Sequence, residues 1–336
     1  ARAASGVDTP EADSSALRLG QAMARSALAG RNKLTLLLSP QLGAFSVWVE
    51  QLVAESTGKS GIGIIPVIDE SLPIGSYGAD RFFVAVTLTD DHTLDETLQA
   101  LAAAGHEIDH HQLDDRYDLA GEFFRWEFAV AVAGSLLAVN PFDEPDVVSS
   151  KQTTRRLLEG KKEEQANSIG EIRDDAGLTL RMPISLVDED AGFSGQLLRF
   201  FQNAGPTNYL TLMPFLYITD DVQNALSELI TALRAVLPLP VILNPGPRYL
   251  HSTGQLHKGG PNTGLYLIIT ASTDTVLAIP GEPYSFSDLN NAQARGDFSS
   301  LVALGRQVAH LDLGSSPQQA LAAVTAEVQL RWTESV

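Results

Sequence analysis

The sequence contains no cysteine and, for its length, few basic residues. The absence of cysteine excludes disulfide bonds and thiolate zinc sites, and it is compatible with a reducing compartment. With 23 Lys and Arg against 41 Asp and Glu, the formal net charge is −18. A chain with no basic stripe cannot neutralise nucleic-acid phosphates or anionic lipid headgroups, so we expect no nucleic-acid or membrane partner. An anionic metabolite would need a local cluster of cations.

Long apolar runs are also missing. No stretch reaches the roughly 18 apolar residues that indicate a transmembrane helix. The first residues, ARAASGVDTPEADSS, have neither an initiating methionine nor the apolar core of a signal peptide, so we interpret them as a linker or an internal cut in a longer protein. The 336 residues, 44% hydrophobic and 19% charged, suffice for two globular domains.

Short apolar runs alternate with amphipathic segments along the chain. This rhythm predicts an α/β fold, with a doubly wound parallel sheet in the first domain and a second α/β domain after it. The charged segment 159–176 is predicted to be the linker between a first domain, 1–158, and a second domain, 177–336. In the first domain the strands are expected at 33–39, 62–67, 81–88 and 106–113.

The segment 48–66, WVEQLVAESTGKSGIGIIP, predicts an amphipathic helix that ends in a glycine-rich loop. Gln51 and Glu55 are one helical turn apart and share a face. Ser56 and Lys59 follow Glu55 closely. A carboxylate beside hydroxyls, glycine and a cation suits a sugar phosphate, and the alternative is a solvated helix end capped by glycine.

Two further segments carry polar groups. The first, 140–151 (NPFDEPDVVSSK), predicts a loop that leads into a helix, with Asp143 as a cap and Lys151 on the early helix; the alternative is a solvated lysine. The second, 246–264, joins two predicted strands and holds two histidines, two cations and several glycines. Such a loop suits an oxyanion, and the alternative is a long surface loop without function.

The segment His106-Glu107-Ile108-Asp109-His110 matches the zinc-binding pattern H-E-x-x-H. That pattern needs a helix, because only there do both histidines reach one metal ion. The segment is predicted here as a strand, on which the two histidines would lie about 13 Å apart. We therefore predict no metal site, and we expect Asp109 and His111 to be ordinary surface residues.

Three of these segments resemble motifs of the phosphoglucose isomerase family. Residues 51–66 resemble its second sugar-isomerase segment, with the spacing Q-x-x-x-E-S-x-G-K. Residues 140–151 resemble N-x-F-D-Q-x-G-V-E-x-x-K, with Glu144 and Asp146 in place of the family's glutamine and glycine. His251, with the Gln-Leu pair that follows it, resembles Q-H-x-x-x-Q-L-x-H, although this loop here follows both other segments instead of lying between them.

The resemblance implies a sugar-isomerase (SIS-like) domain that interconverts glucose 6-phosphate and fructose 6-phosphate through a cis-enediol, without metal or cofactor. Glu55 matches the base that moves the proton between C2 and C1. Lys151 and His251 match the residues that assist ring opening. The residues implied to contact the substrate are Gln51, Ser56 and Lys59.

Longer blocks, from AESTGKSGIGIIPV to RYLHSTGQLHKGGPNTGLYLIIT, resemble the C-terminal portion of bacterial bifunctional transaldolase/phosphoglucose isomerases, over roughly residues 16–313. This implies a cytoplasmic enzyme of glycolysis and gluconeogenesis, for which a homo-oligomer is one possible assembly. The upstream isomerase half and the transaldolase domain would then belong to the same protein. Two alternatives stay open: a catalytically silent sugar-phosphate binding module, and a piece that serves only as structure between domains.

Overall fold

The structure is a computed structural model that describes residues 14–146, 148–159, 168–188, 190–273 and 276–334. By its contacts, the chain divides into two compact units. The first unit consists of the chain up to Asp146 together with His251–Pro261, and the second consists of the remainder. Contacts thus place residues 148–158 in the second unit and the late segment 251–261 in the first. The domain boundaries predicted at 158 and 177 stay a prediction.

Within the described residues, the first unit is built on a four-stranded parallel sheet of order β2-β1-β3-β4. The central strands β1 (Lys33–Leu38) and β3 (Arg81–Leu88) are almost entirely buried, which explains why both read as continuous apolar runs. The flanking strands are β2 (Ile65–Val67) and β4 (Ile108–Leu113). The predicted parallel sheet is confirmed.

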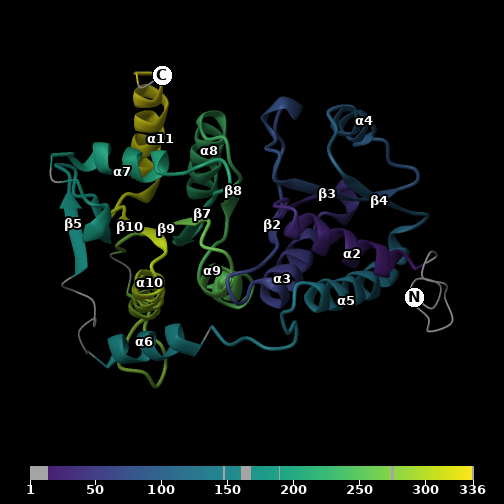
Figure 1. Ribbon diagram of the computed structural model, residues 1–336. Coiled ribbons are helices and arrows are strands. Elements are labelled where there is room, and N and C mark those ends of the chain that lie inside the picture. The colour runs from purple at the N-terminus through teal and green to yellow at the C-terminus, as the bar shows by residue number, and fades with distance from the viewer. Residues whose placement is uncertain (1–13, 147, 160–167, 189, 274–275, 335–336) are drawn as a thin grey trace. The chain divides into compact units, whose positions relative to one another are not determined.

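Helices cover both faces of this sheet. On one face lie α2 (Ser15–Leu28), α3 (Phe45–Thr57) and α5 (Leu119–Leu136) (Figure 1). Their buried apolar side chains form one core with those of β1 and β3. On the other face, α4 (Asp95–Ala103) packs through Leu98 and Leu101 against a separate apolar cluster. The unit is therefore doubly wound, as the alternation of strands and helices predicted.

The second unit has a mixed sheet, which the described residues form in the order β5-β6-β10-β9-β7-β8. The four strands β10, β9, β7 and β8 are parallel, and β6 and β5 extend the sheet in antiparallel fashion. The strand β5 lies inside the segment predicted as a linker, and its register with β6 makes it an edge strand of this sheet. The strand bounds are Ile169–Arg173 (β5), Thr179–Pro183 (β6), Tyr209–Phe215 (β7), Val241–Leu243 (β8), Gly264–Thr270 (β9) and Gln307–Asp312 (β10).

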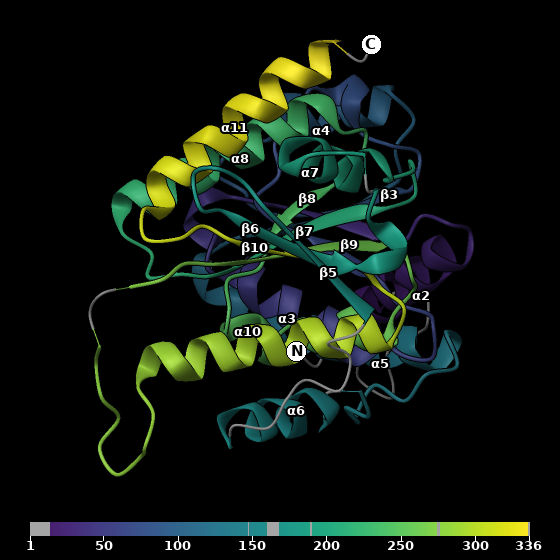
Figure 2. The ribbon, with the colours of Figure 1, turned by 90° about the vertical axis from the view of Figure 1, so that its left-hand side faces the viewer.

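Helices also lie on both faces of the second sheet. Figure 2 shows α7 (Phe193–Gln202), α8 (Asp220–Val236) and α11 (Pro317–Glu334) on one face, where their apolar residues form one core with the strands. The helix α10 (Phe286–Ala303) lies on the other face, and α6 (Val148–Leu158) runs beside it. Among the described residues, no helix has both the length and the apolar composition required to cross a membrane.

Candidate active site around Glu55

The helix α3 brings Glu55 to one end of the first unit. Phe45, Val49 and Val53 recur at a four-residue spacing and face the core, so that Gln51 and Glu55 lie on a more exposed face. Since β1 and β2 are parallel, α3 runs back along the sheet, and its last turn lies toward the amino end of β2. The site is therefore at the amino ends of the strands.

The chain turns sharply after α3, and hydrogen bonds hold the turn. The Thr57 hydroxyl donates to the Val53 carbonyl oxygen at 2.8 Å and accepts from the Ile64 backbone N–H at 3.0 Å. Gly61 has a φ of +77°, a backbone conformation that glycine adopts without strain. Its N–H donates to the carbonyl oxygen of Gly259, a residue of the late segment that belongs to this unit.

That late segment contains a short helix, α9 (Gly254–Gly259), where the sequence predicted only a loop. It packs against the end of α3 with almost no space between the backbones. A Cβ atom on Gly58 would lie 2.4 Å from the Cα atom of Leu256, so only glycine permits this approach. The close packing lets the Gln255 backbone N–H donate to Glu55 Oε1 at 3.1 Å.

The Gln255 side chain, which is fully buried, connects three segments. Its Nε2 donates to the Gly58 carbonyl oxygen at 3.0 Å and to Asp146 Oδ2 at 2.6 Å, and its Oε1 accepts from the Asp146 backbone N–H at 3.0 Å. Each of these polar groups thereby has a partner, as a buried polar network requires. Asp146, which replaces a glycine of the family motif, therefore has a structural role in this chain.

Charged groups of both signs surround Glu55. Burial is the main cause that raises the pKa of the Glu55 carboxyl, and the nearby Glu144 raises it further. The hydrogen bond from Gln255 and the positive charges of Lys258 and Lys59 act in the opposite direction. The result is a carboxylate that accepts a proton more readily than an exposed glutamate, which is the property of a general base.

Lys59, which the sequence predicted to contact the substrate, is buried and bonded to neighbouring residues. Its Nζ forms an ion pair with Asp143 Oδ1 at 3.0 Å and donates to the Asn140 carbonyl oxygen at 2.5 Å. The hydrogen bond from Lys59 is the main cause that lowers the pKa of Asp143. Lys59 therefore connects the turn after α3 to the loop 140–146.

The structure brings most of the predicted site residues into one unit. Gln51, Glu55, Ser56 and Lys59 lie at the end of α3 or just beyond it. The exposed His251 is the first residue of the late segment, three positions before α9 begins. Lys151 lies on α6 in the second unit, and its side chain is outside the described part of the structure. The role of each predicted residue stays a prediction.

Sequence reasoning missed Gln255 and Lys258 as contributors to the site. Both lie in the glycine-rich segment 246–264, which was singled out for its cations and histidines. The available signal was the helical spacing of the two residues, three positions apart, but a six-residue helix between glycines has no clear periodic pattern.

The H-E-x-x-H segment is divided between a loop and a strand. Glu107 Oε2 accepts from Arg31 Nη2 at 2.8 Å, whereas His110 on β4 lies 2.8 Å from the Thr87 hydroxyl through Nε2. The predicted strand is confirmed for 108–113. Among the described residues, no group of three or more His, Cys, Asp or Glu side chains is arranged to hold a metal ion.

The expectation that Asp109 and His111 are ordinary surface residues was wrong. Asp109 Oδ1 pairs with the buried Arg125 at 2.6 Å, and His111 Nδ1 lies 2.6 Å from the buried Glu122. Arg125 and Glu122 are themselves paired on α5 at 3.1 Å. This network joins β4 to α5, and it formed because α5 covers the edge of the sheet where these two strand side chains point.

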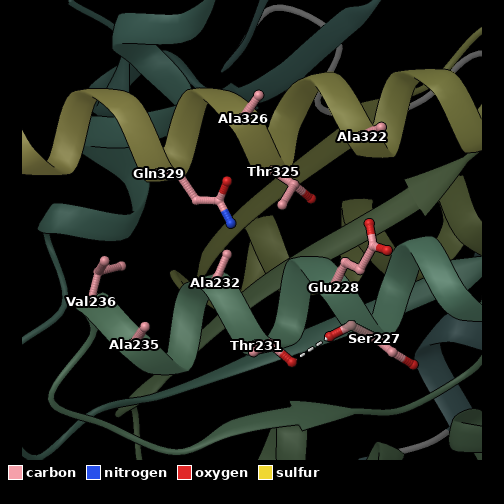
Figure 3. A pocket seen from close by; sticks show the side chains of 10 residues that line it. All are labelled: Ser227, Glu228, Thr231, Ala232, Ala235, Val236, Ala322, Thr325, Ala326 and Gln329. Atoms are coloured by element: carbon pink, nitrogen blue, oxygen red, sulfur yellow. Dashed lines mark hydrogen bonds between the residues drawn. The ribbon is translucent and has the colours of Figure 1, made fainter.

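A pocket of about 620 Å³ lies in the second unit between α8 and α11. Figure 3 shows that small side chains line most of it, with Glu228 and Gln329 as its largest polar groups. The Thr231 hydroxyl turns to the Ser227 carbonyl oxygen of its own helix at 2.8 Å. None of the predicted site residues lines this pocket.

Comparisons with known proteins give a partial likeness. No protein-family model matches the chain. A protein of Natronomonas pharaonis described as "Probable glucose-6-phosphate isomerase" is 29% identical over 167 aligned positions, which cover 39% of this chain. The match covers only 39% of that relative's own length.

Two solved structures align with most of the chain but only loosely. A hypothetical protein from Thermus thermophilus covers 95% of this chain and 85% of its own, with a TM-score of 0.35 and 11% identity. The C-terminal domain of glucosamine-fructose-6-phosphate aminotransferase from Francisella tularensis covers 95% and 94%, with a TM-score of 0.24 and 8% identity. The fold class accordingly rests on the observed strand order and pairing.

Proposed function

We propose that the chain is part of a glucose-6-phosphate isomerase and that Glu55 is its proton-transferring base. The observation that carries the proposal is the state of this carboxylate: half-buried, with a raised pKa, and held in place by the N–H of Gln255. The partial similarity to a protein described as a glucose-6-phosphate isomerase supports the same reaction. Sugar phosphates are thus the proposed ligands.

In the proposed reaction, the ionised Glu55 removes the C2 proton of the open-chain aldose. The electron pair of the C2–H bond forms the C1–C2 double bond, and the C1 carbonyl oxygen takes up a proton, which gives a cis-enediol. Glu55 then returns its proton to C1 while the C2 hydroxyl loses a proton and becomes the ketone. The proposal assigns assistance in ring opening to His251 and Lys151, and substrate contacts to Gln51, Ser56 and Lys59.

The proposal extends to the protein in which this chain occurs. The sequence blocks quoted above favour a fusion in which a transaldolase domain and a first isomerase half belong to the same protein. Cations in that half would stabilise the negative charge that develops on the enediolate oxygens. The cytoplasm is the proposed location, in keeping with a reaction of central sugar metabolism.

The test is a coupled assay of fructose 6-phosphate turnover by this chain, alone and with the upstream half added, beside the variant Glu55→Gln. Glutamine keeps the shape and the hydrogen bond from Gln255 but accepts no proton, so turnover should fall by about 10²- to 10⁴-fold. The matched control is Glu127→Gln, the same substitution at an exposed position on α5, and it should leave turnover unchanged.

Three outcomes would contradict the proposal in different ways. Unchanged turnover in Glu55→Gln would remove Glu55 as the base. Binding of fructose 6-phosphate by calorimetry, without turnover in either format, would favour the silent binding module. Absence of both binding and turnover with the upstream half present would favour a purely structural role.

A further inference from the structure

We infer that Lys258 is a positioning residue that orients the Glu55 carboxylate and favours its charged form, and that it acts through the peptide group that joins Gly254 to Gln255. The inference rests on the proposed function, because it concerns the carboxylate that is proposed as the base. Lys258 stands at the last position of the pattern Q-H-x-x-x-Q-L-x-H, and the resemblance assigned it no role. It is the residue of α9 whose charge acts on Glu55.

The geometry is a bridge of two hydrogen bonds to one peptide group. Lys258 Nζ donates to the carbonyl oxygen of Gly254 at 3.5 Å, and the N–H of Gln255 donates to Glu55 Oε1 at 3.1 Å. The Gly254 carbonyl and the Gln255 N–H belong to the same planar, conjugated unit. The ammonium therefore lies at the negative end of this peptide dipole, and the carboxylate lies at its positive end.

This order of charges strengthens both contacts. A cation at the carbonyl oxygen polarises the peptide group and makes its N–H a better donor, and chained hydrogen bonds reinforce each other by roughly 10–30%. Lys258 is 2% exposed and Gln255 is 0% exposed, so little water screens the interaction. The cation therefore acts on Glu55 both directly through space and through the hydrogen bond that orients the carboxylate.

The other charges around Glu55 do not substitute for Lys258. Glu144 opposes ionisation, and the charge of the second cation, Lys59, is largely compensated by its ion pair with Asp143. Asp146 accepts a hydrogen bond from the side-chain amide of Gln255, whereas Glu55 accepts one from its backbone N–H. The two carboxylates therefore bind different donors of Gln255. Burial raises the proton affinity of Glu55, and the charge of Lys258 acts against that rise.

The test is a titration of the Glu55 carboxyl by ¹³C NMR in the full chain, with its resonance assigned by its loss in Glu55→Gln. Two neutral variants are compared: Lys258→Gln, which can still donate to the Gly254 carbonyl oxygen, and Lys258→Met. Both should raise the pKa of Glu55 above its wild-type value, because a positive charge is lost. Lys258→Arg should restore it toward the wild-type value.

The control Arg25→Met also removes one positive charge from the first unit, but from an exposed side chain at the end of α2. It should leave the titration of Glu55 unchanged. If neither neutral variant of Lys258 moves the Glu55 titration, or if Arg25→Met moves it equally, the inference is wrong. Using two neutral variants and a charged one keeps the test decisive if one of them fails to fold.

The pH dependence of turnover separates this inference from the proposed function. If both hold, the acidic limb of the kcat/KM profile should shift to higher pH in Lys258→Gln, in step with the NMR titration. A shifted titration without turnover in any protein, including the wild type, would contradict the proposed function and leave the role of Lys258 standing. If turnover depends on Glu55 but does not change in the Lys258 variants, the role inferred for Lys258 is wrong and the proposed function stands.

Discussion

Glu55, the proposed base, illustrates at the residue scale how a buried carboxylate opposes stability. The folded protein raises its pKa above the ordinary value of 4.5, mainly through burial. A raised pKa means that the folded state binds the proton more tightly than the unfolded state does. The stability that this supplies is present in full below pH 4.5 and is lost as the pH rises through the folded pKa.

The variant Glu55→Gln should therefore be more stable than the wild type at about pH 8, and the advantage should shrink toward about pH 4. Glutamine carries no charge to desolvate, and its Oε1 can still accept the Gln255 N–H. Thermal melting of both proteins across this pH range measures the effect. A constant difference in melting temperature over the whole range would contradict the assigned shift.

At the scale of elements, the contact between α3 and α9 forms the site. The contact depends on Gly58, because the backbone of α9 occupies the space that any side chain there would need. The same contact places the Gln255 N–H at Glu55. A change that separates the two helices should therefore lower stability and alter the base together.

Gly58→Ala should lower the free energy of unfolding by about 1–3 kcal/mol, as overpacking typically does, and should reduce turnover as well. Denaturant unfolding and the coupled assay measure the two effects. The matched control is Gly121→Ala on α5, where an added Cβ meets no atom within 4 Å. There the stability should rise by up to about 1 kcal/mol, since alanine is the better helix former. Equal behaviour of the two variants would show that the α3–α9 contact is not tight in solution.

At the scale of the whole molecule, the first unit is discontinuous in sequence. Residues 251–261 belong to this unit, although in the chain they follow four strands of the second sheet, β5 to β8. Hydrogen bonds fix this segment in the first unit: Gln255 bonds to Glu55, Gly58 and Asp146, and Gly61 bonds to Gly259. The first unit thus depends on a distant part of the chain.

A fragment that ends at the predicted boundary, residue 158, should accordingly be less stable than the first unit of the intact chain. Trp48 and Trp126 both lie in this unit, so their fluorescence reports its unfolding. The midpoint of urea unfolding should be lower in the fragment, and added fructose 6-phosphate should not raise it. An unchanged midpoint would mean that α9 contributes little to the unit.

Much of the fold could be predicted from local patterns. The strand β3 begins and ends where the sequence predicted, at residues 81 and 88, because a continuous apolar run marks a buried strand. The strand β5 was missed because two of its five residues, IGEIR, are charged and one is glycine. It forms a strand only through its pairing with β6, which is a tertiary contact.

The sequence by itself determined the α/β class, the parallel arrangement of strands in the first sheet and the exclusion of disulfides. It also determined that Glu55 and Gln51 share one face of a helix. These properties follow from composition, from the alternation of apolar runs with amphipathic segments, and from the spacing of residues within one helix. Only the tertiary structure decided that α9 contacts α3, since Gln255 and Glu55 are 200 positions apart. It also decided the charge environment of Glu55, because burial and nearby charges depend on which distant segments fold together.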